Sequence, residues 1–180
     1  MLRLKQILVP IDFSDRSRRA LHYALSLAGE NSATITVLHV ANDLHAWELQ
    51  SDEFSSIAPA GRLWPADRVV AEASLELSHF LEPYREAIAK IPAVAKKITL
   101  GPIAREIASA AGELQSDLIV MSPRRNRTFA QILTGSITDR VTRLSPCPVL
   151  SVTDPLPSRP WQGKMTYIGF GWPRQRMAGI

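Results

Sequence analysis

Short apolar runs alternate with stretches of helical periodicity along most of this chain. Runs of this kind, rich in β-branched residues, are typical of strands buried on both faces of a parallel sheet. Lys96 and Lys97 place the third run nearer an edge of the sheet. Pro10 cannot donate a ladder hydrogen bond, so we expect the first strand to stop there. The runs are Gln6 to Ile11, Thr34 to Val40, Ala93 to Leu100, Asp117 to Met121 and Val149 to Val152.

Helices are predicted between these runs. Ser14 or Asp15 caps the first, which ends at Gly29, and Gly101-Pro102 opens the third. The second begins at Ala66 and continues to Ile88 with a kink at Pro83. Residues 41–65 predict a long loop over the carboxyl end of the sheet. Strand, helix, strand units of this length favour right-handed crossovers, and hence an α/β three-layer sandwich.

Length and composition limit the class of protein to which this chain can belong. A chain of 180 residues with 46% hydrophobic and 21% charged residues is typical of one globular domain. Its apolar runs are too short for a membrane span, and Met1 to Ser14 lacks the pattern of a signal peptide. We therefore expect a cytoplasmic protein without a membrane partner. The single cysteine, Cys147, excludes an intramolecular disulfide.

The net charge of +4 lies mostly in the tail. Residues 154–180 hold four basic residues and one acidic residue, so they carry +3 of it. A nearly neutral domain without a basic stripe argues against a nucleic-acid partner. A local cluster of arginines does occur at Arg124, Arg125, Arg127, Arg140 and Arg143.

Candidate chemistry lies where predicted strands end. Asp12 follows the first strand at its carboxyl end, where open α/β sheets place ligands. Gly135-Ser136 opens the last helix, and the unpaired N–H groups of a helix N-terminus favour anions. The alternatives are simple helix initiation at Gly135-Ser136, a carboxylate at the helix dipole for Asp12, and a solvated loop for the arginines.

Several ordered motifs resemble the universal stress protein family. They are KQILVPIDFSDRSRRAL, LGPIAREIASAAGELQSDLIVM and LTGSITDRVTRLSPCPVLSV, and the resemblance covers roughly residues 3 to 153. It implies a universal stress protein domain over residues 1–153, followed by an extension over 154–180. In the extension, Met165 to Phe170 predicts one further strand or a loose tail.

The resemblance implies the sheet order 3-2-1-4-5 and a candidate nucleotide site. One branch of the family binds ATP and another lacks the nucleotide. The matching positions are Asp12 near adenine and ribose, Val40 at the base, Ser122 and Arg125 at two glycine positions, and Gly135, Ser136 and Ile137 at the phosphate. Pro10 is a further candidate cofactor-binding residue.

Ser122 and Arg125 depart from the family's pattern, which has glycine at both positions. Side chains there restrict backbone approach to a triphosphate, whereas an arginine can also bind phosphate. We therefore expect a stress-response regulatory protein with a degenerate site that does not bind ATP tightly. The alternative is a module that binds ATP, AMP or another anion through the arginine-bearing loop.

Catalysis is not expected. The segment PIDFSD replaces the Ser-Gly-Gly loop that related ATP pyrophosphatases need, and the sequence holds no nucleophile elbow or Walker loop. The sequence also predicts no metal site. The family resemblance implies a homodimer through the last strand, Val149, Leu150, Ser151 and Val152, where pairing with a second copy would cover an apolar edge.

Overall fold

Five parallel strands form one sheet in the order β3-β2-β1-β4-β5. The computed structural model describes residues 4–41, 66–122 and 137–152. The predicted α/β fold class and strand order are confirmed. The strands are β1 (Gln6–Ile11), β2 (Thr34–Ala41), β3 (Val94–Leu100), β4 (Leu118–Met121) and β5 (Val149–Ser151).

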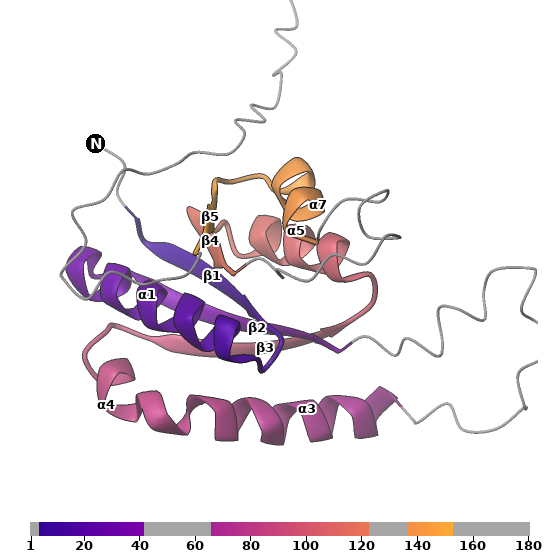
Figure 1. The fold of residues 1–180 in the computed structure, drawn as a ribbon, viewed down its shortest axis with the longest axis horizontal. Helices are drawn as coiled ribbons and strands as arrows, with labels where there is room; N and C mark the ends of the chain where they lie inside the picture. Colours follow the sequence, from indigo (N-terminus) through magenta and orange to yellow (C-terminus); the bar gives the residue numbers. More distant parts are fainter. Residues whose placement is uncertain (1–3, 42–65, 123–136, 153–180) are drawn as a thin grey trace, which may run out of the picture.

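Helices cover both faces of the sheet (Figure 1). Those on one face are α1 (Asp15–Asn31) and α3 (Ala66–Leu81), and those on the other are α5 (Ile103–Glu113) and α7 (Ile137–Leu144). None of the helices in the described ranges is long and apolar enough to span a membrane.

The centre of the sheet separates two hydrophobic cores. Ile7, Leu8 and Val9 of β1 are fully buried, which explains the continuous apolar run in the sequence. Because side chains alternate along a strand, Ile7 and Val9 pack with α1 and α3, whereas Leu8 packs with α5 and α7. The same alternation assigns each residue near the ends of the strands to one face or the other.

Helix α1 begins as predicted but ends later. Ser14 is its N-cap, and its side chain accepts a hydrogen bond from the N–H of Ser17. The predicted end at Gly29 is wrong, because the helix continues to Asn31. Ser32 takes the left-handed conformation instead, with φ of 52°, and its N–H donates to the carbonyl of Ala28.

Pro83 interrupts the second predicted helix, as expected. Helix α3 ends at Leu81, a short 3-10 segment η1 (Glu82–Tyr84) follows, and one further turn forms α4 (Arg85–Ile88). Proline lacks the N–H that an α-helical bond to the preceding turn requires. The chain therefore changes direction at this point before it enters β3.

Pro10 does not end β1, contrary to expectation. The strand continues to Ile11, and Pro10 and Ile11 still pair with Leu38 and His39 of β2. The carbonyl of Lys5 accepts from β2, and that of Gln6 from the segment that leads into β4. Even-numbered residues thus turn their backbone groups toward β4, and Pro10 offers no donor there. The described pairs between β1 and β4 are Ile7 with Leu118 and Leu8 with Ile119.

The edge strand β3 carries two lysines fixed to helices on opposite faces. Lys96 Nζ donates to Ser78 Oγ of α3 at 3.0 Å, and Lys97 Nζ contacts Glu113 Oε2 of α5 at 2.6 Å. The predicted edge position of this strand is confirmed by the sheet order. Charged side chains on an edge strand oppose further strand pairing.

Three predicted features lie outside the described residues. They are the long loop after Ala41, the arginine-bearing segment before α7, and the extension over 154–180 with its predicted strand at Met165 to Phe170.

Candidate functional site

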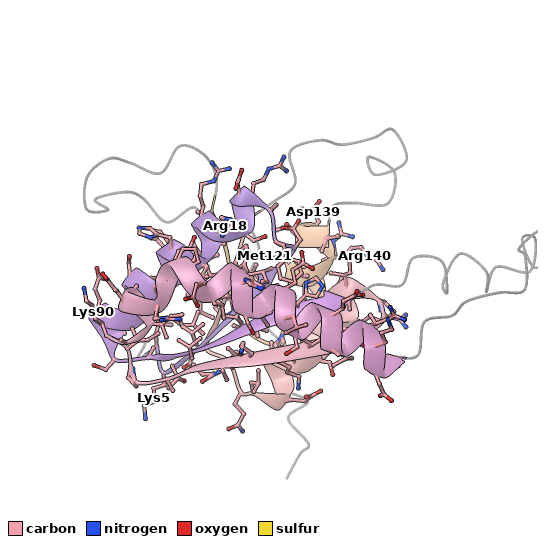
Figure 2. The ribbon with its side chains drawn as sticks, turned by 90° about the horizontal axis from the view of Figure 1, so that it is seen from below. Lys5, Arg18, Lys90, Met121, Asp139 and Arg140 are labelled. Atoms are coloured by element: carbon pink, nitrogen blue, oxygen red, sulfur yellow. The ribbon has the colours of Figure 1, made fainter. Side chains whose placement is uncertain are left out.

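The candidate site lies at the carboxyl ends of β1 and β4, where the strand order reverses. From β1 the chain passes through α1 to β2 on one side, and it later returns through α5 to β4 on the other side. In open α/β sheets, ligands bind outside the carboxyl ends of the strands at such a switch point. Met121, the last residue of β4, is labelled in Figure 2 together with Asp139 and Arg140 of α7.

Three predicted site residues, Pro10, Val40 and Ile137, share the α5 and α7 face of the sheet with Met121. Val40 and Met121 belong to the hydrophobic core on this face, and Ile137 packs against it as the first residue of α7. Pro10 lies on the same face, because it is two residues beyond Leu8 along β1. Pro10, the predicted base contact Val40 and the start of α7 therefore face the same layer.

Thr99 adds a polar group beside Val40. The two residues pair across β2 and β3, and the neighbouring Ile98 packs against the opposite core, so Thr99 faces α5. Its hydroxyl oxygen is buried and has no hydrogen-bond partner among the residues that the structure describes. A buried hydroxyl without a partner is uncommon and costs stability, which makes it a candidate ligand contact. Sequence reasoning missed Thr99, because one threonine in a strand gives no functional signal.

The carboxylate of Asp12 is held in the turn that leads into α1. Its Oδ1 accepts from the N–H of Ser14 at 3.2 Å, from the hydroxyl of Ser14 and from the hydroxyl of Ser17. The N–H of Asp12 donates to Ser17 Oγ at 3.0 Å, which closes the ring of contacts. Asp12 itself is exposed, whereas Ser17 is buried. The helix-terminal role expected as one alternative is therefore present, and the ligand role stays a prediction.

Phe13, between Asp12 and Ser14, has a left-handed backbone with φ of 59°. Its ring lies 4.3 Å from that of His39 and 5.7 Å from that of Phe80, measured between centroids. Side chains in this conformation are uncommon outside glycine, asparagine and aspartate. The sequence gives no local signal for it, since the ring contacts come from β2 and α3.

Arg18 and Tyr84 extend the aromatic contacts to η1. The guanidinium of Arg18 lies 4.5 Å from the centre of the Phe80 ring, and Tyr84 Oη donates to the carbonyl of Arg18 at 3.2 Å. Figure 2 labels Arg18 on α1, with α3 passing in front of the sheet in this view. Burial raises the pKa of Tyr84, and the charge of Arg18 opposes this in part. The start of α1 is thus tied to the end of α3.

Ser122, predicted at a glycine position of a phosphate loop, bonds to the last strand. Its hydroxyl donates to the carbonyl of Val152 at 2.8 Å, and the N–H of Val152 donates to the carbonyl of Met121 at 2.8 Å. These two bonds join the last residue of β4 and the residue after it to Val152, which follows β5. The side chain of Ser122 is therefore directed toward β5.

The comparisons with known proteins identify the family to which this α/β fold belongs. The sequence profile of the Universal stress protein family matches residues 3–153. The chain belongs to the universal stress protein family. Arg125, Gly135 and Ser136, which complete the phosphate side of the predicted universal stress protein site, lie outside the described residues.

Individual universal stress proteins align over most of the chain. YxiE of Bacillus subtilis is 32% identical over 148 residues, which cover 82% of this chain and 97% of the relative. UspA from Lactobacillus plantarum is similar in structure, with a TM-score of 0.57, 25% identity and coverage of 84% of this chain and 99% of that one. A universal stress protein in complex with cAMP has a TM-score of 0.63 at 21% identity, and the match covers 84% and 98% of the two chains.

Proposed function

We propose that this protein is a cytoplasmic, homodimeric stress-response regulator whose nucleotide site is degenerate and does not bind ATP tightly. Membership of the universal stress protein family supports the regulatory role. We further propose that residues 1–153 form the functional domain, that residues 154–180 are an extension, and that the protein is not an enzyme. The turn PIDFSD, where Asp12 bonds to Ser14 and Ser17, supports the last point.

The hydrogen bond from Ser122 to Val152 carries the proposal of a degenerate site. The family pattern implies glycine at position 122, where the backbone must approach a triphosphate. Here a side chain is present, and its hydroxyl is engaged by a carbonyl of the last strand. A ligand that needs this space must displace Ser122 and leave the Val152 carbonyl without its partner, which costs free energy. Arg125 adds a second, larger side chain at the next glycine position.

A smaller adenine nucleotide such as AMP is the second candidate ligand. A structural neighbour of this chain is a universal stress protein in complex with cAMP, which carries a single phosphate group. Pro10 and Val40 share one face of the sheet, which suits a base bound at Val40, and Thr99 adds a buried hydroxyl beside Val40. With one phosphate, a ligand needs less of the space beside Ser122, and Arg125 supplies a cation for it.

Titration calorimetry with ATP, AMP and inorganic phosphate tests both candidates. The degenerate-site proposal expects no heat of binding with ATP for the wild type and a gain of ATP binding in Arg125→Gly, alone or combined with Ser122→Gly. Strong stabilisation of the wild type by ATP, seen as a melting temperature that rises with concentration, would contradict it. Binding of AMP but not of phosphate favours the second candidate. Thr99→Val should then weaken AMP binding without lowering stability, since the hydroxyl makes no hydrogen bond within the described ranges.

The homodimer is proposed to form through β5. Val149, Leu150 and Ser151 are partly exposed at the edge of the sheet, next to β4. An apolar edge strand with unpaired backbone groups is a template for a second copy of the same strand. Sedimentation equilibrium of the full chain, and of a chain that ends at Asp154, tests this proposal. A monomer mass for both chains would remove the homodimer.

A further inference from the structure

The left-handed backbone of Phe13 must be held by its surroundings. With φ of 59°, this residue occupies a conformation that a bulky side chain adopts only when the neighbouring structure determines it. Glycine would adopt the same turn without a steric cost. The ring must therefore contribute something that offsets the backbone strain.

The Phe13 ring lies among side chains from β2 and α3. His39 lies 4.3 Å from it with the ring planes tilted by 32°, and Phe80 meets it edge to face at 5.7 Å and 68°. His39 is itself oriented by a contact of 3.1 Å between its Nδ1 and the carbonyl of Ile11. Arg18 lies over Phe80 at 4.5 Å, so both rings are fixed by further contacts. Tilted and edge-to-face arrangements at these separations are favourable.

The two residues that flank Phe13 carry the polar contacts of the candidate site. Asp12 Oδ1 accepts from the N–H of Ser14, and the N–H of Asp12 donates to Ser17 Oγ. Two consecutive residues thus carry a ring packed on the α1 and α3 side and a carboxylate exposed at the switch point. If Phe13 changes its backbone angles, the N–H of Ser14 and the hydroxyl of Ser17 move relative to Asp12, and the carboxylate loses the donors that orient it.

We propose that Phe13 is a positioning residue for Asp12. The ring packs against His39 and Phe80, and these contacts fix the left-handed turn. The turn then holds the Asp12 carboxylate in one orientation at the switch point. A ligand hydroxyl then meets an acceptor that is already ordered, and no free energy is spent on ordering it during binding. The ligand half of this inference rests on the proposed nucleotide site, whereas the fixing of the turn does not.

Amide hydrogen exchange measures the fixing of the turn without any ligand. Phe13→Gly removes the ring and keeps a backbone free to adopt positive φ. The amides of Asp12, Ser14 and Ser17, which donate within the turn, should then exchange roughly tenfold faster, the scale expected for losing two aromatic contacts. The amide of Ile35, which donates to the carbonyl of Ala93 at 3.0 Å, should change less than about twofold.

Two further variants distinguish the loss of the Phe13 ring contacts from the effect of introducing a glycine and from a general loss of stability. Ser32→Gly places glycine at another left-handed position, with φ of 52°, and should leave the turn amides unchanged. Phe80→Leu keeps Phe13 but removes its edge-to-face partner, and should accelerate exchange at the same amides. If Phe13→Gly leaves the turn amides as protected as in the wild type, or if all amides accelerate equally, the inference is wrong.

Calorimetric titration with AMP in an Asp12 and Phe13 double-mutant cycle tests the positioning. Phe13→Gly should weaken AMP binding several-fold in the wild type and should have no further effect once Asp12→Ala is present. An equal loss in both backgrounds would mean that Phe13 supports the fold alone, which would overturn the positioning role. If the wild type does not bind AMP, the AMP candidate fails by itself, and the exchange data alone decide whether Phe13 orders Asp12.

Discussion

The hydroxyl of Ser122 lies 2.8 Å from the carbonyl oxygen of Val152 and donates a hydrogen bond to it. This bond joins segments that follow β4 and β5, and it is partly buried. Ser122→Ala should lower the free energy of unfolding by about 1 kcal/mol, the usual net contribution of such a bond. Urea unfolding at constant m-value measures the change.

Ser26→Ala is the matched control for this prediction. Its hydroxyl also bonds to a backbone carbonyl, that of His22, but it does so on the exposed side of α1. Water replaces this bond easily, and alanine favours a helix, so stability should stay unchanged or rise slightly. Equal losses in the two variants would contradict a special role for the Ser122 bond.

Gly101 links β3 to α5 with φ of +141°, a conformation that other residues rarely adopt. A β-carbon there would lie 2.9 Å from Glu106 Oε1, at the end of a flexible side chain. Gly101→Ala should therefore lower the free energy of unfolding by about 1 to 3 kcal/mol, mainly through backbone strain. Because Glu106 can move, adding Glu106→Ala should restore little of the loss.

Gly29→Ala is the same chemical change as Gly101→Ala, but it should raise the stability of the protein instead of lowering it. This glycine lies within α1, and a β-carbon added there would have open space around it, with no atom of another described residue within 4 Å beyond its chain neighbours and the helix backbone. Alanine should stabilise the protein here by about 0.5 to 1 kcal/mol through helix propensity. Thermal unfolding of both variants separates the backbone effect from the added methyl group, and a stabilising Gly101→Ala would refute the prediction of strain.

Cys147 should react slowly in the folded protein. Burial raises the pKa of its thiol above the ordinary 9.0, and the hydrogen bond with Ser145 opposes this in part. Since the thiolate is the reactive form, iodoacetamide near pH 8 should modify the native protein at least about tenfold more slowly than the urea-unfolded chain. Ser145→Ala removes the opposing contact and should shift the midpoint of the pH-rate profile upward. Equal rates in the native and unfolded states would contradict the prediction.

Tyr84 should make the protein less stable at alkaline pH. Burial, as the largest cause, raises its folded-state pKa above the unfolded value of 10.0. Its contribution is fully present below that value and is lost as the pH rises through the folded pKa. The difference in melting temperature between the wild type and Tyr84→Phe should therefore be constant below about pH 10 and should shrink as the pH rises above that value. A difference that stays constant above that value would show that Tyr84 does not titrate as described.

Sequence patterns predicted the central strands well because burial on both faces makes them nearly continuous apolar runs. The apolar run predicted the start of β1 at Gln6, whereas Pro10 was expected to stop the strand and does not, since β1 ends at Ile11. The proline instead affects only the side that faces β4, since its pairing with β2 continues to Ile11. A sequence does not reveal toward which neighbour a backbone group turns, so this distinction required the structure.

The turn at the candidate site was less predictable. Asp12 was identified from its place after β1, but its bonds to Ser14 and Ser17 depend on the left-handed conformation of Phe13. That conformation is stabilised by His39 and Phe80, which lie far from it in the sequence. Local propensity points away from such a turn, and tertiary contacts override it. The predicted end of α1 at Gly29 was also wrong, because Ser32 rather than a glycine takes the left-handed cap position.

The lysines of β3 limit how copies of this chain can associate. With Lys96 and Lys97 fixed to helices on both faces of that edge, only the β5 side of the described sheet is suited to accept a strand. A sheet that can grow in both directions can form open-ended fibrils, whereas one with a single receptive side ends after a symmetric pair. The protein should therefore remain in a finite, closed assembly even when it is abundant.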